Sequence, residues 1–88
     1  MNKLLNKKRQ EVDNLDYELL KILSERFKIT DEIGVLKKTS DQKTLQPERF
    51  KNILETRIQF SSDLNINKDF IIQLFTLIHN ESIKRQLL

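Results

Sequence analysis

Residues 12–36 have the sequence VDNLDYELLKILSERFKITDEIGVL, in which apolar side chains recur with the period of an α-helix. In a heptad repeat whose a positions include Val12, seven of the eight a and d positions in this stretch are apolar. The only glycine of the chain, Gly34, lies near the end of the stretch. The pattern predicts one long helix, from about residue 4 to residue 38, with an apolar seam that packs against other helices.

Two shorter helices are predicted downstream. Pro47 suits the first turn of a helix, so a second helix is expected to begin there. Asn67 is a typical N-cap for a third helix, which carries an apolar stripe and continues to Gln86. Polar loops are expected at 39–44 and 61–67. The predicted fold class is therefore all-α, with one long, one short and one medium helix.

The composition narrows the classes of function. A chain of 88 residues fits one domain, here taken as residues 1–88. With no cysteine and one histidine, a disulfide scaffold, a thiol nucleophile and a zinc site are not expected. A single glycine excludes Gly-rich phosphate loops and, with a single proline, argues against an all-β domain.

Charge and hydropathy suggest where the protein acts. The net charge of +3 is small and acidic residues are interspersed with basic ones, so nucleic acid is not an expected partner. No apolar run approaches the roughly 18 residues of a membrane span, and the N-terminus has no apolar signal-peptide core. A cytoplasmic protein with no membrane partner is therefore predicted.

The predicted long helix does not fit a small monomer. A helix of about 35 residues spans ~52 Å, whereas a compact domain of this size has a radius of gyration of about 12 Å. Either the helix breaks, with Gly34 as the candidate position, or a second chain covers the exposed seam. We expect a second chain, because the apolar pattern runs through both ends of the helix and two-fold homodimers are the commonest closed arrangement.

Cationic residues lie on or beside the seam. Arg26 occupies an a position, and Lys37 lies about 20° around the helix from it and ~16 Å along it. Two long cations at this spacing can hold a small dianion; a buried ion pair for Arg26 and a solvated Lys37 are the structural alternatives. Arg9 lies ~25 Å from Arg26 and cannot reach the same ligand. In an antiparallel pair of long helices, however, Arg9 of one chain falls beside the Arg26–Lys37 stretch of the other.

Three further polar residues lie where a bundle interior is expected. Arg49 falls in the first turn of the second helix, and Ser82 and Gln86 continue the i, i+4 stripe of the third. They either face a site or are solvated. The lone His79 has no obvious carboxylate and nucleophile companions, so a catalytic triad is not supported and a surface or interface position is expected.

These residues follow one another in a specific order and spacing: Arg9-x2-Val12-x2-Leu15-Asp16-x2-Leu19-Leu20-x2-Leu23-x2-Arg26, Ile33-Gly34-x2-Lys37, Pro47-Glu48-Arg49 and Ser82-x3-Gln86. The set resembles the all-helical chorismate mutases of the AroQ class over nearly the whole chain. The resemblance implies an intertwined helical homodimer with two equivalent sites, each completed by an arginine from the other chain. It also implies the pericyclic rearrangement of chorismate to prephenate, without metal or cofactor, in the shikimate pathway toward aromatic amino acids.

The resemblance further implies roles for individual residues. Arg9, lent across the dimer, and Arg26 would bind the substrate carboxylates, with Ser82 beside one of them. Lys37 would contact a carboxylate and the ether oxygen of the substrate. Gln86 would donate a hydrogen bond to that ether oxygen.

The remaining positions concern the ring side of the substrate. The resemblance implies that Arg49 orders the charges of the site and that Ile33 forms an apolar wall. The family usually has an acid directly after the helix-two arginine, near the ring hydroxyl, where this chain has Phe50. Gln46 aligns with a second hydroxyl-contacting acid and can still form a hydrogen bond. This difference keeps two alternatives open: an isochorismate pyruvate-lyase on the same scaffold, and a non-catalytic helical dimer that regulates or docks onto another enzyme.

Overall fold

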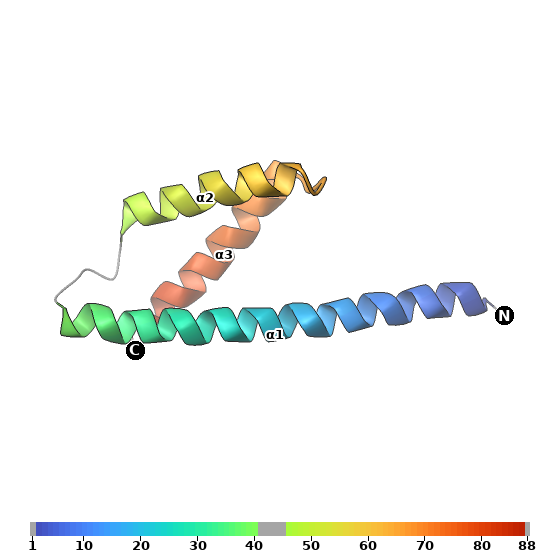
Figure 1. Cartoon of the computed structure of the whole chain (residues 1–88), viewed down its shortest axis with the longest axis horizontal. Helices are drawn as coiled ribbons and strands as arrows, with labels where there is room; N and C mark the ends of the chain where they lie inside the picture. Colours follow the sequence, from blue (N-terminus) through green and yellow to red (C-terminus); the bar gives the residue numbers. More distant parts are fainter. Residues whose placement is uncertain (1, 41–45, 88) are drawn as a thin grey trace.

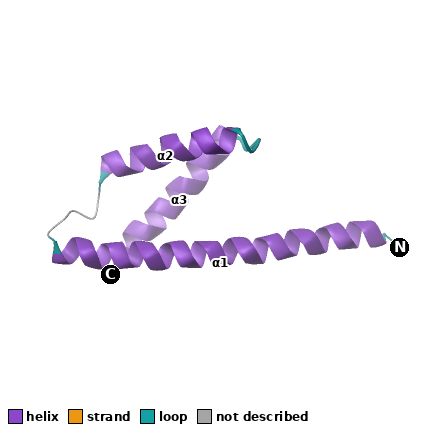
Figure 2. Ribbon diagram, in the orientation of Figure 1, coloured by secondary structure: helices purple, strands orange, loops and turns teal. Residues whose placement is uncertain are grey.

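The computed structural model describes residues 2–40 and 46–87, and that part of the chain forms three α-helices (Figure 1). Helix α1 spans Lys3–Thr39, α2 spans Pro47–Ser62 and α3 spans Lys68–Gln86. No strand occurs among the described residues (Figure 2), and the all-α prediction is confirmed. Helix α1 continues through Gly34, so the alternative of a break at this glycine is wrong.

The helix starts follow the local sequence. Asn2 Oδ1 accepts a hydrogen bond from the Leu5 amide at 3.0 Å, and Asn67 Oδ1 accepts one from the Phe70 amide at 3.0 Å. Each bond satisfies an amide that has no partner within the helix. Pro47 occupies the first turn of α2, where its missing N–H costs nothing. The predicted starts of the second and third helices are therefore confirmed.

The connection between α2 and α3 is shorter than predicted. The sequence predicts that the loop begins at Ser61, but α2 continues through Ser62. A tight turn follows, in which Asn65 has a φ of 60°, a left-handed conformation that asparagine tolerates better than most residues. The other predicted loop, 39–44, lies mostly outside the described residues, and Thr39 is the last residue of α1.

Helix α3 holds the other two helices together. It packs against both α1 and α2, whereas the described parts of α1 and α2 make no close backbone contact with each other. Figure 1 shows α2 and α3 placed over the C-terminal part of α1, while the N-terminal part of α1 extends away from them. The molecule measures 60 × 25 × 15 Å and has a radius of gyration of 16.8 Å, against about 12 Å for a compact domain of this length.

A single chain buries few apolar side chains. Ile53, Ile71 and Ile78 are the buried hydrophobic residues in the described part of the chain. Every described residue from 2 to 22 is exposed, and the seam residue Leu19 keeps 53% of its surface. The predicted packing of the seam against other helices is therefore not met in its N-terminal half within one chain. A long exposed apolar surface is typical of an interaction site. None of the described helices is both long and apolar enough to cross a membrane.

Candidate functional site

A cavity of about 160 Å³ lies between the C-terminal parts of α1 and α3 and the start of α2. It contains every site residue that the sequence assigned to a single chain. These are Arg26, Ile33, Lys37, Gln46, Arg49, Ser82 and Gln86. Arg9 is not among the lining residues, because it lies on the exposed N-terminal half of α1. The spacing along three separate helices thus brings seven of the eight predicted side chains to one place.

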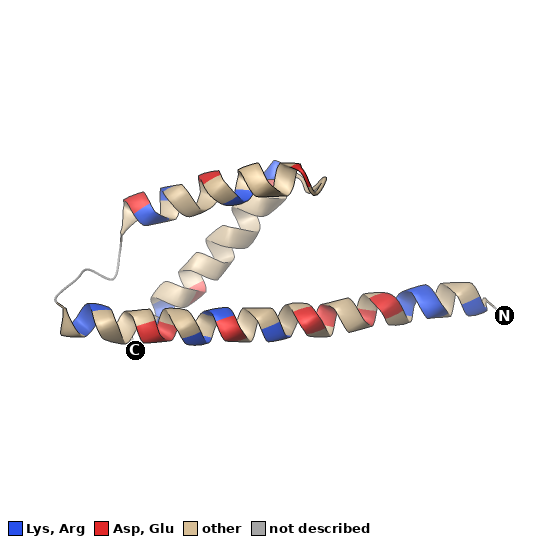
Figure 3. Ribbon diagram, in the orientation of Figure 1, with Lys and Arg blue, Asp and Glu red and all other residues tan. Residues whose placement is uncertain are grey.

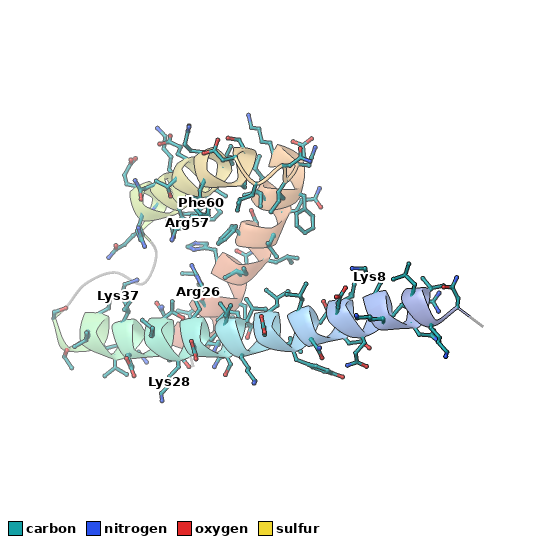
Figure 4. All side chains as sticks on the ribbon, turned by 45° about the vertical axis from the view of Figure 1, so that its right-hand side comes forward. Lys8, Arg26, Lys28, Lys37, Arg57 and Phe60 are labelled. Carbon is teal, nitrogen blue, oxygen red and sulfur yellow. The ribbon has the colours of Figure 1, made fainter. Side chains whose placement is uncertain are left out.

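The cations of α1 share one side of that helix. Arg26 and Lys37 lie on the side that faces α2, whereas Lys28 lies on the opposite side (Figure 4). This agrees with their predicted 20° separation around the helix axis. Arg57 extends from α2 on the side of Arg26 (Figure 4) without lining the cavity, whereas Arg49 at the start of α2 does line it. The site therefore gathers positive charge from two helices.

Arg26 brings a partly buried positive charge to the site. Its side chain is half-buried, and its Nη1 atom is buried without a hydrogen-bond partner among the described residues. Burial lowers the pKa of Arg26, and the nearby cations Arg57 and Arg49 lower it further. A guanidinium nevertheless stays protonated in proteins, so the cavity holds a permanent charge with an unused donor. A buried donor without an acceptor is destabilising unless a ligand supplies one.

The buried side chain of Gln86 is held by one hydrogen bond to α1. Its Nε2 donates to the Thr30 carbonyl oxygen at 3.0 Å, which uses one of its two amide protons, and its Oε1 has no partner in the described part of the chain. Thr30 Oγ1 donates to the Phe27 carbonyl at 3.1 Å and lies 3.4 Å from Ser82 Oγ. Ser82 and Gln86 are only 6% and 7% exposed, so the third-helix stripe faces inward as its spacing predicts. One amide proton and one carbonyl oxygen of Gln86 remain available to a ligand.

The C-terminal turn of α3 is fixed onto α1 by an ion pair. Arg85 Nε donates to Asp31 Oδ1 at 3.1 Å and Arg85 Nη2 donates to Asp31 Oδ2 at 3.0 Å. This two-point contact raises the pKa of Arg85, and its guanidinium also stacks over the Phe27 ring, 4.9 Å from the centroid. Because Gln86 is the next residue, the ion pair fixes the backbone from which the Gln86 amide enters the cavity.

Helix α2 supplies the opposite wall. Arg49 is exposed at the mouth of the cavity, where its Nη1 donates to Asn52 Oδ1 at 3.3 Å. Phe50 points at α3 and stacks on His79, with ring centroids 4.1 Å apart and planes inclined by 19°. His79 is half-buried and lines the cavity, so it does not lie on the open surface of the chain. Whether it also meets a second chain stays a prediction.

Four lining residues were missed in the sequence: Thr30, Ile53, His79 and Ile83. A signal was available for two of them. Thr30 lies four residues after Arg26 and so shares its helical face, and His79 lies three residues before Ser82. Neither residue is marked as a site residue by the sequence alone, because a threonine or a lone histidine carries no motif by itself.

The chemistry that this arrangement supports is anion binding. No aspartate or glutamate among the described residues lines the cavity. The described residues also contain no group of His, Cys, Asp and Glu suited to a metal ion. Acids and bases are mixed along the middle of α1 (Figure 3), whereas the charged residues described in the cavity lining are all cations. Fixed cations and one neutral amide around a small hollow are suited to a small, multiply charged anion.

An all-helical chain with a cation-lined hollow for a small anion is the class of protein that the fold and site define. Residues 8–87 match the family model described as chorismate mutase type II. The chain therefore belongs to the chorismate mutase type II family, a family of isomerases.

Curated relatives agree with this assignment. The chain is 33% identical over 78 residues to a bifunctional chorismate mutase/prephenate dehydratase of Buchnera aphidicola from Acyrthosiphon pisum, covering 89% of this chain and 20% of the relative. It is 30% identical over 78 residues to the bifunctional enzyme of the same name from Escherichia coli K12, with the same coverage. It is 24% identical over 82 residues to a chorismate mutase of Methanocaldococcus jannaschii, covering 91% of this chain and 83% of that enzyme. The chain spans about a fifth of the length of the bifunctional relatives.

Proposed function

We propose that this chain catalyses the rearrangement of chorismate to prephenate. The observation that carries the proposal is the buried Nη1 of Arg26, a charged donor without a partner among the described residues, at a cavity that no described carboxylate lines. Such a donor is satisfied by a ligand oxygen that carries negative charge. Chorismate is a dicarboxylate dianion, and family membership points to it.

Binding and orientation follow from the cations. A guanidinium can take a carboxylate through two parallel hydrogen bonds, which suits Arg26 to one carboxylate of the substrate. Lys37, on the same face of α1, serves the second charged group. Holding both carboxylates folds the flexible enolpyruvyl arm over the ring and brings the reacting carbons together. Ser82 lies beside a carboxylate in this arrangement.

The reaction requires no proton transfer. The ether C–O bond breaks while a C–C bond forms, and negative charge develops on the ether oxygen in the transition state. Lys37 and the free amide proton of Gln86 are donors suited to that oxygen. Donors fixed in advance stabilise the charge of the transition state more than that of the substrate, which lowers the barrier.

Residues of α1 and at the start of α2 contact the ring side of the substrate in this proposal. In this proposal Gln46 forms a hydrogen bond with the ring hydroxyl and Ile33 forms an apolar wall, while Arg49 closes the charged side at the start of α2. Phe50 cannot bind a hydroxyl, and its ring is already occupied by the stack on His79. Recognition of the hydroxyl therefore rests on the Gln46 side of the site.

We also propose that two copies of this single domain form an intertwined homodimer. Seam residues such as Leu19 are exposed in one chain, and an apolar hollow of about 640 Å³ between α2 and α3, lined in part by Phe60 and Phe75, offers a complementary surface. An antiparallel partner helix would cover both, as a two-fold interface requires. It would also bring Arg9 of the partner subunit to the cavity as a further carboxylate ligand.

The activity is tested with purified protein and chorismate. Loss of the chorismate absorbance with accumulation of prephenate is expected, and Lys37→Ala protein prepared in parallel is expected to be far slower. Release of salicylate and pyruvate from isochorismate, without conversion of chorismate, would replace the proposal with a lyase. No turnover of either compound by folded protein would leave only a binding role.

The shared site is tested by mixing inactive subunits. A heterodimer of Arg9→Ala and Lys37→Ala chains has one intact site and one doubly altered site. Random pairing should therefore restore roughly a quarter of wild-type activity. The matched control mixes Lys37→Ala with Gln86→Ala, because both changes fall on residues supplied by the same chain and no intact site can form. Equal recovery, or none, in both mixtures would argue against a site completed across the dimer.

A further inference from the structure

His79 lies in the cavity, but the proposed mechanism gives it no role. The imidazole is stacked on Phe50, with ring centroids 4.1 Å apart and planes inclined by 19°. This contact covers one face of the ring and fixes its plane. The two nitrogens lie at the ring edge, which the stack leaves uncovered. No hydrogen bond joins them to the described residues.

Among the described residues, the charges that face this imidazole are all positive. Helix α1 contributes Arg26 and Lys37 to the cavity, and α2 contributes Arg49. The other polar groups that α3 itself brings to the lining, Ser82 and Gln86, are neutral. Burial lowers the pKa of His79, and the charges of Arg26 and Lys37 lower it further. In the free protein this environment therefore favours the neutral ring.

A bound dianion is expected to act in the opposite direction and to favour the protonated imidazole of His79. Two negative charges between Arg26 and Lys37 cancel the field that disfavours a charged imidazole. An opposite charge within about 4–6 Å typically moves a pKa by 1 to 3 pH units toward the charged form. A protonated imidazole can then donate to a carboxylate oxygen as a charged donor.

We propose that His79 is a further ligand-binding residue of this site, whose imidazole takes up one proton from solvent when a dicarboxylate enters the cavity and donates it in a hydrogen bond to a carboxylate. The identity of that dicarboxylate as chorismate rests on the proposed function. Because the protonated form favours the bound state, binding becomes tighter as the pH falls toward 6.

The chain allows a direct measurement, because His79 is its only histidine. Ring resonances of labelled protein are followed by NMR against pH, alone and with saturating succinate or glutarate as non-reacting dicarboxylates. The pKa of His79 is expected below 6.5 in the free protein and about 1 to 3 pH units higher with either dianion. Neutral succinamide should leave it unchanged. An unchanged pKa at saturation, or failure of both dianions to bind, would overturn the proposal.

A matched variant moves the imidazole out of the site. In the double variant His79→Gln, Asn80→His the single histidine lies on the exposed neighbouring position of α3. Its pKa should not respond to either dianion. A response equal to that of the natural protein would show that the effect is general to the surface and would contradict a specific role for His79.

Kinetics separate this inference from the proposed function. For His79→Gln, KM for chorismate should rise about tenfold at pH 6, more than kcat falls, and the difference should shrink by pH 8.5. Normal turnover with an unresponsive His79 would overturn this inference alone. A His79 that responds to dianions in a protein without chorismate turnover would overturn the proposed function alone.

Discussion

Gly34 lies against Gln86, so closely that a Cβ atom on Gly34 would stand 2.7 Å from Gln86 Cγ. Glycine is unfavourable inside a helix by about 1 kcal/mol relative to alanine, yet this one sits within α1 at an ordinary helical φ. Glycine is therefore required here because it has no side chain, and not because the backbone adopts an unusual conformation. The missing side chain allows the buried Gln86 to reach the Thr30 carbonyl.

Gly34→Ala is expected to lower kcat by about 10- to 100-fold, because displacing a donor by an ångström is enough to misplace it in a transition state. Circular dichroism should show intact helices, since alanine favours α1. The change is repeated in a Gln86→Ala background, where the clash partner is absent. If Gly34→Ala is as harmful there as in the natural chain, the glycine has a role unrelated to Gln86.

Lys37→Ala is expected to reduce kcat by about 10²- to 10³-fold, the range found when one preorganised donor to a developing charge is removed. Lys38→Ala is the matched control, because Lys38 is exposed and does not line the cavity. Its kcat should stay within about twofold of the natural value. Equal losses in both variants would show that only the general positive charge of this turn matters.

Arg26→Met is expected to abolish turnover and yet to raise the free energy of unfolding of the free protein by up to about 1 kcal/mol. Methionine removes the half-buried charge and its unpartnered Nη1 while filling similar volume. Urea unfolding without ligand measures the change. A clear loss of stability would mean that Arg26 has a structural partner in the assembled protein.

Ile22→Glu is expected to separate the proposed dimer and to remove activity, although Ile22 does not line the cavity. It occupies a d position of the seam and is 61% exposed in one chain. Tyr17→Glu is the matched control, because Tyr17 is 62% exposed but lies outside the a and d positions. Analytical ultracentrifugation with activity assays distinguishes the two. A dimeric Ile22→Glu protein would place the interface elsewhere.

The stability of the ligand-free protein is expected to depend on His79 below pH 6.5. Because the folded pKa is lower than the unfolded value, the unfolded state binds more protons in that window. Stability from the neutral ring is complete above pH 6.5 and decreases as the pH falls. His79→Gln should weaken this dependence in thermal unfolding curves between pH 5 and 8. Identical curves for both proteins would indicate that the folded and unfolded pKa values are equal.

Most of the fold was predictable because its determinants are local. Pro47 and Asn67 mark helix starts through the chemistry of their own residues, and the angular spacing of Arg26 and Lys37 follows from helix geometry alone. The spacing of His79 from Ser82 indicates a shared helical face, but the orientation of the His79 ring could not be predicted in the same way. That orientation depends on the stack against Phe50, which lies on another helix and brings together residues far apart in the sequence.

The apolar seam shows a second limit of sequence-based prediction. Periodicity identified which side chains of α1 share a face, but it could not tell whether that face packs within the chain or against another molecule. Here the N-terminal half of the seam is exposed in the single chain. The role of Arg9 is a prediction for the same reason, because any partner of that half of α1 lies outside one chain.

The exposed N-terminal half of α1 also bears on how the native state is reached. A helical segment without tertiary neighbours is only marginally stable in water, so this half gains little from the folding of its own polypeptide. If a second copy supplies the missing neighbours, its arrival completes the helix, and chain folding and chain encounter become one kinetic event. The rate at which helical signal returns after dilution from denaturant should then increase with protein concentration instead of being first order.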